Sequence, residues 1–194
     1  MAWIAERAGF PVAGFLDDDP HKDSQTLAGR AVLGALASWK DLPADHRFLN
    51  SLYGAKKMRL FASIIDALAI PDTRWATVVD PSAVVSPEAS IAAGCFVGPG
   101  CVVEPGVQMG RLSVLLGNVY IAHDCRLEAY VACANSASVA GGVDVHTNSY
   151  IGANATVREY TQIGKDVVVG MGAVVTRRIP DNQVAVGNPA RASC

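Results

Sequence analysis

The sequence has few aromatic and few charged residues for its length. Tryptophan, tyrosine and phenylalanine make up 7% of the 194 residues and charged residues 18%, although 51% of the chain is hydrophobic. The apolar content therefore comes mainly from small and β-branched side chains, which favour strands. A hydrophobic fraction of this size also excludes a disordered chain.

An excess of basic charge and a long apolar run are both missing. The formal net charge is −2, so the chain lacks the basic surface that neutralises nucleic-acid phosphates, and we expect no nucleic-acid partner. No window holds eighteen consecutive apolar residues, and residues 1–10 predict a short amphipathic helix instead of a signal peptide. We therefore expect a cytoplasmic protein with no segment inserted in a membrane.

Cysteine pairs with C-x-x-C spacing are absent as well. The five cysteines fit small buried thiols in a reducing compartment better than they fit a disulfide framework. They are Cys95, Cys101, Cys125, Cys133 and Cys194.

Residues 79–180 repeat with a period of six. Stepping by six from Val79 to Val175, sixteen of seventeen positions hold Val, Ile, Leu or Met, whereas random placement would put about five such residues there. The position four residues further along is always small or β-branched. The position before that one is Gly, Asn or Asp in ten of the seventeen hexads, and these residues tolerate positive φ. A tight corner therefore recurs every six residues.

A short strand followed by a corner, repeated without insertion, can close only by winding into a parallel β-helix. We predict such an all-β domain over residues 77–194. The pattern resembles the hexapeptide-repeat acyltransferase family, and the resemblance covers residues 79–191. It implies a left-handed helix of nearly six triangular coils, in which residues eighteen apart stack. It also implies a homotrimer with the site in a cleft between subunits.

The end of the repeat extends this match. Residues 170–180 read Gly-Met-Gly-Ala-Val-Val-Thr-Arg-Arg-Ile-Pro, and residues 184–191 read Val-Ala-Val-Gly-Asn-Pro-Ala-Arg. Both stretches are similar to the closing coil and signature of the family, where this region lines the groove for the pantetheine arm of acyl-CoA. The alternative is that the glycines and the proline only terminate the solenoid. The resemblance implies acetyl-CoA as cosubstrate and no metal.

Residues 1–76 differ from the repeat and contain all three tryptophans. We expect short strands at residues 11–16 and 47–53, the first of them buried, and a helix at residues 58–68. This alternation predicts a separate α/β front domain over residues 1–76.

The front domain is similar to the small Rossmann-like domain of bacterial acetyltransferases that modify nucleotide-linked amino sugars or sialic acid. The run Gly-Phe-Leu-Asp-Asp-Asp-Pro at residues 14–20, Gly54 and residues 80–83 carry the similarity. It implies a nucleotide-sugar or sugar acceptor that contacts Asp17, Asp18 and Gly54. A solvated acidic turn is the alternative for the two aspartates.

One element of those front domains is missing from this sequence. They usually begin with a strand and a Gly-rich turn that presents N–H groups to a nucleotide phosphate. Here the sequence starts inside the helix that would follow. Either the true start lies upstream of Met1, or the phosphate loop is absent and the front domain is truncated.

His123 is the strongest candidate for chemistry. It stands in the run Tyr-Ile-Ala-His-Asp-Cys between the inward positions Ile121 and Cys125, so its side chain should project from a corner. Acyl transfer from a thioester needs a group that accepts the proton of the nucleophile, and imidazole titrates near neutral pH. The pair matches the family's His-Asp motif, which implies that His123 is the general base, and Asp124 would fix its tautomer. A solvated corner histidine is the alternative.

Counting eighteen residues from His123 reaches Gly141, which with Gly142 should lie one coil away on the same corner. Glycines there would let a thioester approach the backbone, and the Gly141 N–H would stabilise the developing oxyanion. The resemblance further implies pantetheine contacts and one contact to a CoA phosphate. The pantetheine positions are Gly152, Ala153 and Met171, and the phosphate position is Arg191.

Two other functions stay open on the sequence alone. A zinc enzyme of the carbonic anhydrase type uses similar coils but needs three histidine ligands, and only His123 and His146 lie on the coils. His146 should instead stack between Glu128 and Gly164 at the surface. A non-catalytic scaffold is suggested by the missing Gly-rich turn and by Ala132, where the related sugar acetyltransferases often carry a second histidine. We predict an acetyl-CoA-dependent transferase that acetylates an amino or hydroxyl group of a sugar.

Overall fold

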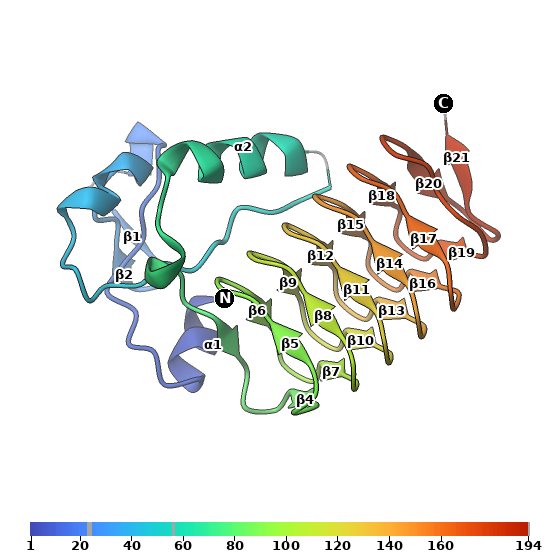
Figure 1. Ribbon diagram of the computed structural model, residues 1–194. Helices are drawn as coiled ribbons and strands as arrows, with labels where there is room; N and C mark the ends of the chain where they lie inside the picture. The colour runs from blue at the N-terminus through green and yellow to red at the C-terminus, as the bar shows by residue number, and fades with distance from the viewer. Residues whose placement is uncertain (23–24, 56, 194) are drawn as a thin grey trace.

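The computed structural model describes residues 1–22, 25–55 and 57–193. A parallel β-helix begins at β3 and carries one two-residue strand per hexad as far as β19. An N-terminal segment of short helices and turns lies against the first coils (Figure 1). The β-helix predicted from the six-residue period is confirmed.

Three sheets form the faces of the prism. Each strand pairs in parallel with its equivalents in the neighbouring coils, so that Tyr120 lies opposite Val102 on one side and Ser138 on the other. This register confirms the predicted stacking of residues eighteen apart. The first face ends in β20 and the antiparallel β21.

The faces contain the following strands. The first face holds β3 (Val78–Val79), β6 (Phe96–Val97), β9 (Val114–Leu115), β12 (Ala132–Cys133), β15 (Tyr150–Ile151), β18 (Val168–Val169), β20 (Val184–Val186) and β21 (Arg191–Ser193). The second face holds β4 (Val84–Val85), β7 (Val102–Val103), β10 (Tyr120–Ile121), β13 (Ser138–Val139), β16 (Thr156–Val157) and β19 (Val174–Val175). The third face holds β5 (Ser90–Ile91), β8 (Gln108–Met109), β11 (Arg126–Leu127), β14 (Asp144–Val145) and β17 (Gln162–Ile163).

The inward side chain of each hexad fills the prism. Leu115, Ile121 and Leu127, from three successive strands, are all but inaccessible to solvent. The prism is too narrow for aromatic rings in these positions, which explains why the core relies on small and β-branched residues.

Four of the five cysteines are buried and free, as predicted, whereas Cys194 lies outside the described residues. The thiols of Cys95, Cys101 and Cys125 donate to carbonyl oxygens fifteen residues further along the chain. These contacts satisfy polar atoms that burial would otherwise leave unpaired. Burial also raises the pKa of the Cys95 thiol to about 11, so the thiol stays neutral.

The predicted corners are also present. The residue before the small inward position has positive φ in every hexad from Gly94 to Gly172. Bulky residues share this conformation at three corners, Leu112, Tyr130 and Tyr160, where it is unusual for such side chains.

The N-terminal segment contains little regular structure. Its elements are α1 (Ala2–Arg7), η1 (Pro20–Lys22), the antiparallel pair β1 (Thr26–Leu27) and β2 (Arg30–Ala31), η2 (Leu36–Asp41), α2 (Met58–Leu68) and η3 (Asp72–Arg74). The helix expected at residues 58–68 is confirmed.

The strands expected at residues 11–16 and 47–53 do not form. Each segment is extended but joined to its neighbour by a single parallel bridge, Phe15 to Val32 and Phe48 to Trp75. Residues 11–16 are exposed or half-buried, so the expectation of a buried strand was wrong. A strand needs a ladder of consecutive bridges, and each of these segments has a single bridge only.

The N-terminal segment covers the first face of the prism. Ile4 of α1 and Met58 of α2 belong to one apolar cluster with Phe96, Val114 and Ala132 of the first face. This packing supplies most of the attachment, because removal of apolar surface from water is the main favourable contribution.

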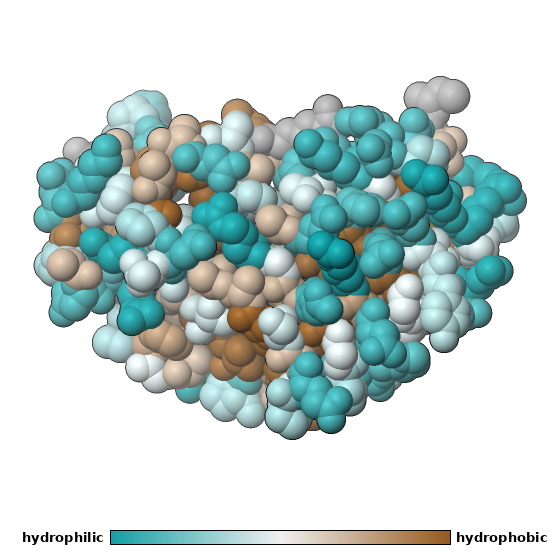
Figure 2. All heavy atoms as spheres, in the orientation of Figure 1, coloured by the Kyte–Doolittle hydropathy of each residue, from teal (hydrophilic) through white to brown (hydrophobic). Residues whose placement is uncertain are grey.

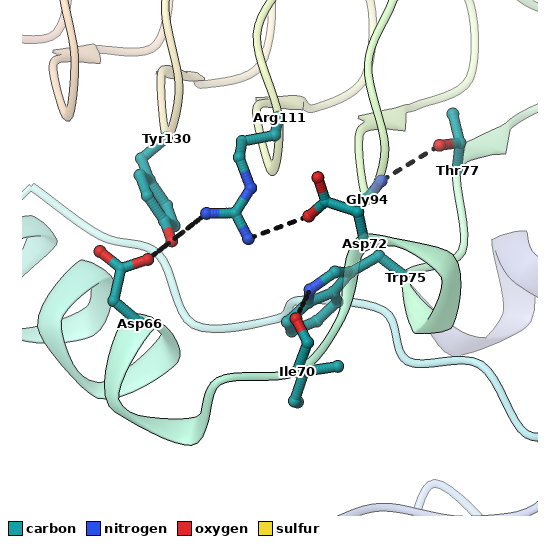
Figure 3. Close-up of polar contacts among 8 residues, drawn as sticks. All are labelled: Asp66, Ile70, Asp72, Trp75, Thr77, Gly94, Arg111 and Tyr130. Atoms are coloured by element: carbon teal, nitrogen blue, oxygen red, sulfur yellow. Dashed lines mark hydrogen bonds and ion pairs between the residues drawn. The ribbon is translucent and has the colours of Figure 1, made fainter. Parts of the chain in front are cut away.

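Polar contacts add to the attachment at the corner between the third and first faces. Figure 3 shows Arg111 between Asp66 and Asp72, at 3.4 Å and 3.3 Å, and the Tyr130 hydroxyl donating to Asp66. The two aspartates are largely exposed, so each ion pair contributes little energy on its own. The cluster fixes the end of α2 and η3 relative to the coils.

No helix within the described residues is long and apolar enough to cross a bilayer.

Replacing one inward residue tests the stacked core. Leu115 is fully buried between Val97 and Cys133 of the adjoining coils. We expect Leu115→Ala to lower the free energy of unfolding by about 3 kcal/mol, because the neighbouring coils cannot collapse into the cavity. Gln108→Ala, on the outer side of the third face, should change it by less than about 0.5 kcal/mol. Chemical denaturation measures both, and equal effects would contradict the core assignment.

Candidate functional site

His123 lies where the second face turns into the third, in the four-residue turn between β10 and β11. We call the stack of these turns the His123 corner: residues 86–89, 104–107, 122–125, 140–143, 158–161 and 176–179. The imidazole is half exposed, at 54% of its side-chain surface. It is therefore within reach of a ligand from solvent.

The neighbouring carboxylate orients the imidazole. Asp124 Oδ2 lies 2.9 Å from His123 Nδ1, and Asp124 occupies the positive-φ position of its turn. A carboxylate accepts the hydrogen bond, so Nδ1 carries the proton and Nε2 presents its lone pair. The arrangement is that of a base with an orienting acid.

Glycines on adjacent coils make room for both side chains. A Cβ on Gly141 would lie 2.6 Å from His123 Nε2, and a Cβ on Gly106 would lie 2.4 Å from Asp124 Oδ1. Both distances are far inside van der Waals contact. The imidazole therefore packs directly on the Gly141 backbone, as the eighteen-residue count predicted.

The two N–H groups of the glycine pair differ in availability. The Gly142 N–H donates to the His123 carbonyl at 2.9 Å. The Gly141 N–H takes part in none of the hydrogen bonds found within the described residues. The Gly141 N–H therefore has no partner among these bonds, whereas the Gly142 N–H has one.

Glu104 of the His123 corner and Tyr120 of β10 also belong to the site, and neither was predicted from the sequence. Glu104 accepts a hydrogen bond from the His123 backbone N–H at 2.8 Å and another from the Tyr120 hydroxyl. Both hydrogen bonds lower the pKa of the Glu104 carboxyl, and the one from the Tyr120 hydroxyl has the larger effect. Glu104 therefore stays ionised and holds the turn that carries His123. No motif in the sequence marks these two residues.

Gly152, Ala153 and Met171 lie on a different corner, where the first face turns into the second. We call this stack of turns the Gly152 corner: residues 80–83, 98–101, 116–119, 134–137, 152–155 and 170–173. A Cβ on Gly152 would lie 2.6 Å from the Met171 nitrogen, so the two turns are in backbone contact. The Met171 side chain is 82% exposed. Within this chain the width of the second face separates these residues from His123.

The remaining predicted residues lie apart from the His123 corner. Arg191 is exposed in β21. Asp17 accepts hydrogen bonds from Lys22 Nζ and the Asp19 backbone, which lower the pKa of its carboxyl. Asp18 accepts from the Leu36 backbone at 2.7 Å.

Gly54 is the third predicted residue of the front segment. It has φ +154° with open space around it. None of the hydrogen bonds or ion pairs in the described part of the chain joins Asp17 or Asp18 to Gly54.

His146 occupies the third corner, between the third and first faces. Its Nδ1 lies 3.1 Å from Glu128 Oε1, and its Nε2 lies 2.8 Å from Gln162 Nε2, so both ring nitrogens have partners. The predicted pairing with Glu128 is confirmed. Among the described residues, no three His, Cys, Asp or Glu side chains are grouped so that they could hold a metal ion.

Ala132 is buried on the first face, not at the His123 corner. It lines a small cavity of about 10 Å³ together with Met58 of α2 and Asn148. This volume suits about one water molecule. A longer side chain at this position would point into the boundary between the N-terminal segment and the coils.

Comparison with known proteins agrees with the repeat seen here. A family model described as the hexapeptide repeat of succinyl-transferase matches residues 89–122 and 134–177. Over these residues the chain carries the hexapeptide repeat of that family. An acyl-[acyl-carrier-protein]–UDP-N-acetylglucosamine O-acyltransferase from Alkalilimnicola ehrlichii is 36% identical over 72 residues, which are 37% of this chain and 28% of that protein. The chain thus spans less than a third of that relative's length.

Solved structures are similar over nearly the whole hexapeptide-repeat chain. A mutant perosamine N-acetyltransferase from Caulobacter crescentus, in complex with CoA and GDP-perosamine, is 28% identical with a TM-score of 0.89, over 99% of this chain and 90% of that one. Its substitution replaces a histidine by asparagine. The acetyltransferase domain of PglB from Neisseria gonorrhoeae, in complex with acetyl coenzyme A, is 27% identical with a TM-score of 0.86, over 99% of this chain and 92% of that one.

Adding one methyl group tests the packing of His123 on Gly141. Gly141 does not have positive φ, so its backbone accepts alanine, and the clash with the imidazole is the main consequence. We expect Gly141→Ala to displace the ring, which imidazole ¹⁵N–¹H NMR would detect as shifted His123 resonances. Gly117→Ala is the matched control, because Gly117 has the same place in its hexad and its Cβ would meet nothing closer than 3.6 Å. Unchanged His123 resonances in Gly141→Ala would refute the contact.

Proposed function

We propose that this protein transfers the acetyl group of acetyl-CoA to an amino or hydroxyl group of a sugar, with His123 as general base. The observation that carries the proposal is the His123 corner. An imidazole with a free Nε2 lies on a glycine whose N–H is available. The similarity to acetyltransferases with CoA, acetyl-CoA and a nucleotide-linked sugar bound supports it.

The chemistry follows from the positions of these groups. The acceptor nitrogen or oxygen attacks the thioester carbonyl carbon while His123 Nε2 takes its proton. The carbonyl oxygen gains charge as the tetrahedral intermediate forms, and the Gly141 N–H donates to it. Asp124 stabilises the imidazolium through Nδ1. The intermediate collapses by breaking the carbon–sulfur bond, and the proton on Nε2 goes to the departing sulfur.

The acceptor is a nucleotide-linked amino sugar in this proposal. It would bind on the side of the N-terminal segment, where Asp17, Asp18 and Gly54 are the proposed contacts. Acetyl-CoA would lie on the side of the later coils, with Gly152, Ala153 and Met171 along the pantetheine arm and Arg191 at a phosphate. The cytoplasmic location expected from the sequence belongs to the same proposal.

The separation of the two corners supports a homotrimer. His123 lies at one edge of the second face and Gly152 at the other, so only a neighbouring copy can bring the two corners together across a cleft. Neither the 10 Å³ cavity nor a 330 Å³ groove on the third face is lined by His123. The site therefore needs a second copy to enclose its ligands.

The outward side chains indicate which face makes the contact. Those of the second face are mostly apolar or small: Val84, Val102, Tyr120, Ser138, Thr156 and Val174. Those of the third face are all polar: Ser90, Gln108, Arg126, Asp144 and Gln162. The third face crosses the middle of the coils in Figure 1, and the surface there is largely hydrophilic in Figure 2. The N-terminal segment already covers β6, β9 and β12 of the first face, so at these coils the second face is the one left for other copies.

A charge on the second face tests the interface. We expect Val102→Arg to shift the protein from trimer to monomer in sedimentation velocity, because the arginine would be buried without a partner. Gln108→Arg places the same charge on the third face of the same coil and should leave the trimer intact. A monomeric wild type, or equal behaviour of the two variants, would contradict the proposed assembly.

Removing the imidazole tests the chemistry. We expect His123→Ala to lower acceptor-dependent release of CoA thiol by about 10²- to 10⁴-fold, because no other group at the corner takes the proton. His146→Ala removes the other histidine on the coils and should retain turnover. CoA binding, measured by calorimetry, should persist in both variants. Equal turnover in His123→Ala and wild type would refute the mechanism, and CoA binding without any turnover in wild type would favour a scaffold.

A further inference from the structure

Tyr160 is a large aromatic side chain left uncovered at the His123 corner. It is 80% exposed, whereas Leu112 and Tyr130, the other bulky residues in the left-handed corner conformation, are buried. Those two pack in one cluster with Ile65 and Trp75 of the N-terminal segment. Within the described residues, no segment covers Tyr160 in the same way.

The ring of Tyr160 packs on Gly142, the glycine next to the one on which His123 packs. A Cβ on Gly142 would lie 2.6 Å from Tyr160 Cδ1, just as a Cβ on Gly141 would lie 2.6 Å from His123 Nε2. The Tyr160 N–H also donates to the Gly141 carbonyl at 2.9 Å. His123 belongs to the coil before the glycine pair and Tyr160 to the coil after it. The two rings therefore flank the turn whose N–H is proposed to hold the thioester oxygen.

The position of Tyr160 along the prism axis indicates which part of acetyl-CoA it would contact. Neighbouring coils are about 4.8 Å apart, and Tyr160 is in the same coil as Gly152 and Ala153. In a trimer whose axis runs along the prism, Tyr160 of one protomer would therefore lie level with Gly152 and Ala153 of the partner subunit. A chain that leaves the thioester at Gly141 and continues towards the later coils passes between them.

We propose that Tyr160 binds the pantetheine arm of acetyl-CoA and thereby positions the thioester between His123 and Gly141. This assignment rests on the proposed function. The arm is a flexible chain of methylene and amide groups, and a rigid aromatic face gains contact area with such a chain at little entropic cost. The acceptor is placed on the other side, towards Glu104 and the N-terminal segment.

The test separates the ring from the corner geometry. Tyr160→Asn removes the ring but keeps a residue suited to positive φ, as Asn118, Asn148 and Asn154 are in the same hexad position. Tyr160→Phe keeps the ring. We expect Tyr160→Asn to weaken CoA binding about tenfold by calorimetry and to raise KM for acetyl-CoA by a similar factor. Tyr160→Phe should bind CoA within about twofold of wild type.

The outcomes distinguish this inference from the proposed function. CoA binding that falls in Tyr160→Asn supports it even if no sugar acceptor is ever turned over. Unchanged CoA binding would overturn it, as would an increase confined to the KM of the acceptor. Loss of the trimer in sedimentation would also overturn it, because Tyr160 would then contact the partner chain itself. Trp3→Ala, which removes an exposed aromatic from α1, should leave CoA binding unchanged.

Discussion

Stacking of residues eighteen apart governs the arrangement of this molecule. Coils about 4.8 Å apart leave little space at a corner for a side chain that folds back over the adjacent turn. At the His123 corner, glycines in the adjacent turns provide that space. Gly141 serves His123 in this way, and Gly106 serves Asp124. His123 and Asp124 are thus packed against backbone, which is more rigid than another side chain would be.

The three faces of the prism differ in their outward side chains and in what covers them. The first face carries aromatic and aliphatic residues and is covered by the N-terminal segment. The third face is polar, and the second is largely apolar yet uncovered. Because the second face has His123 at one edge and Gly152 at the other, assembly through that face in the proposed trimer would also complete the proposed site. This links the choice of outward residues in β4, β7 and β10 to the proposed chemistry.

Much of the β-helix was predictable because it depends on local periodicity. The strand positions, the left-handed corners and the contact of His123 with Gly141 all follow from counting six or eighteen residues. The same count leads from Asp124 to Gly106 and from Gly142 to Tyr160. The positions of Gly106 and Tyr160 could therefore also have been predicted. Whether residues 11–16 and 47–53 form strands could not be predicted in this way, because a strand exists only where a partner pairs along its length. Glu104 and Tyr120 could not be predicted either, because their hydrogen bonds depend on side-chain orientation across two coils.

Complementation between two inactive variants tests the central claim, that each site combines the His123 corner of one protomer with the Gly152 corner of the partner subunit. His123→Ala lacks the base, and Ala153→Trp would block the opposite corner. Each alone should be inactive. The whole trimer population from equal co-expression should regain about a quarter of wild-type turnover, because that share of all sites pairs an intact His123 with an intact Ala153. No recovery in verified mixed trimers would show that one protomer supplies both corners and would contradict the account.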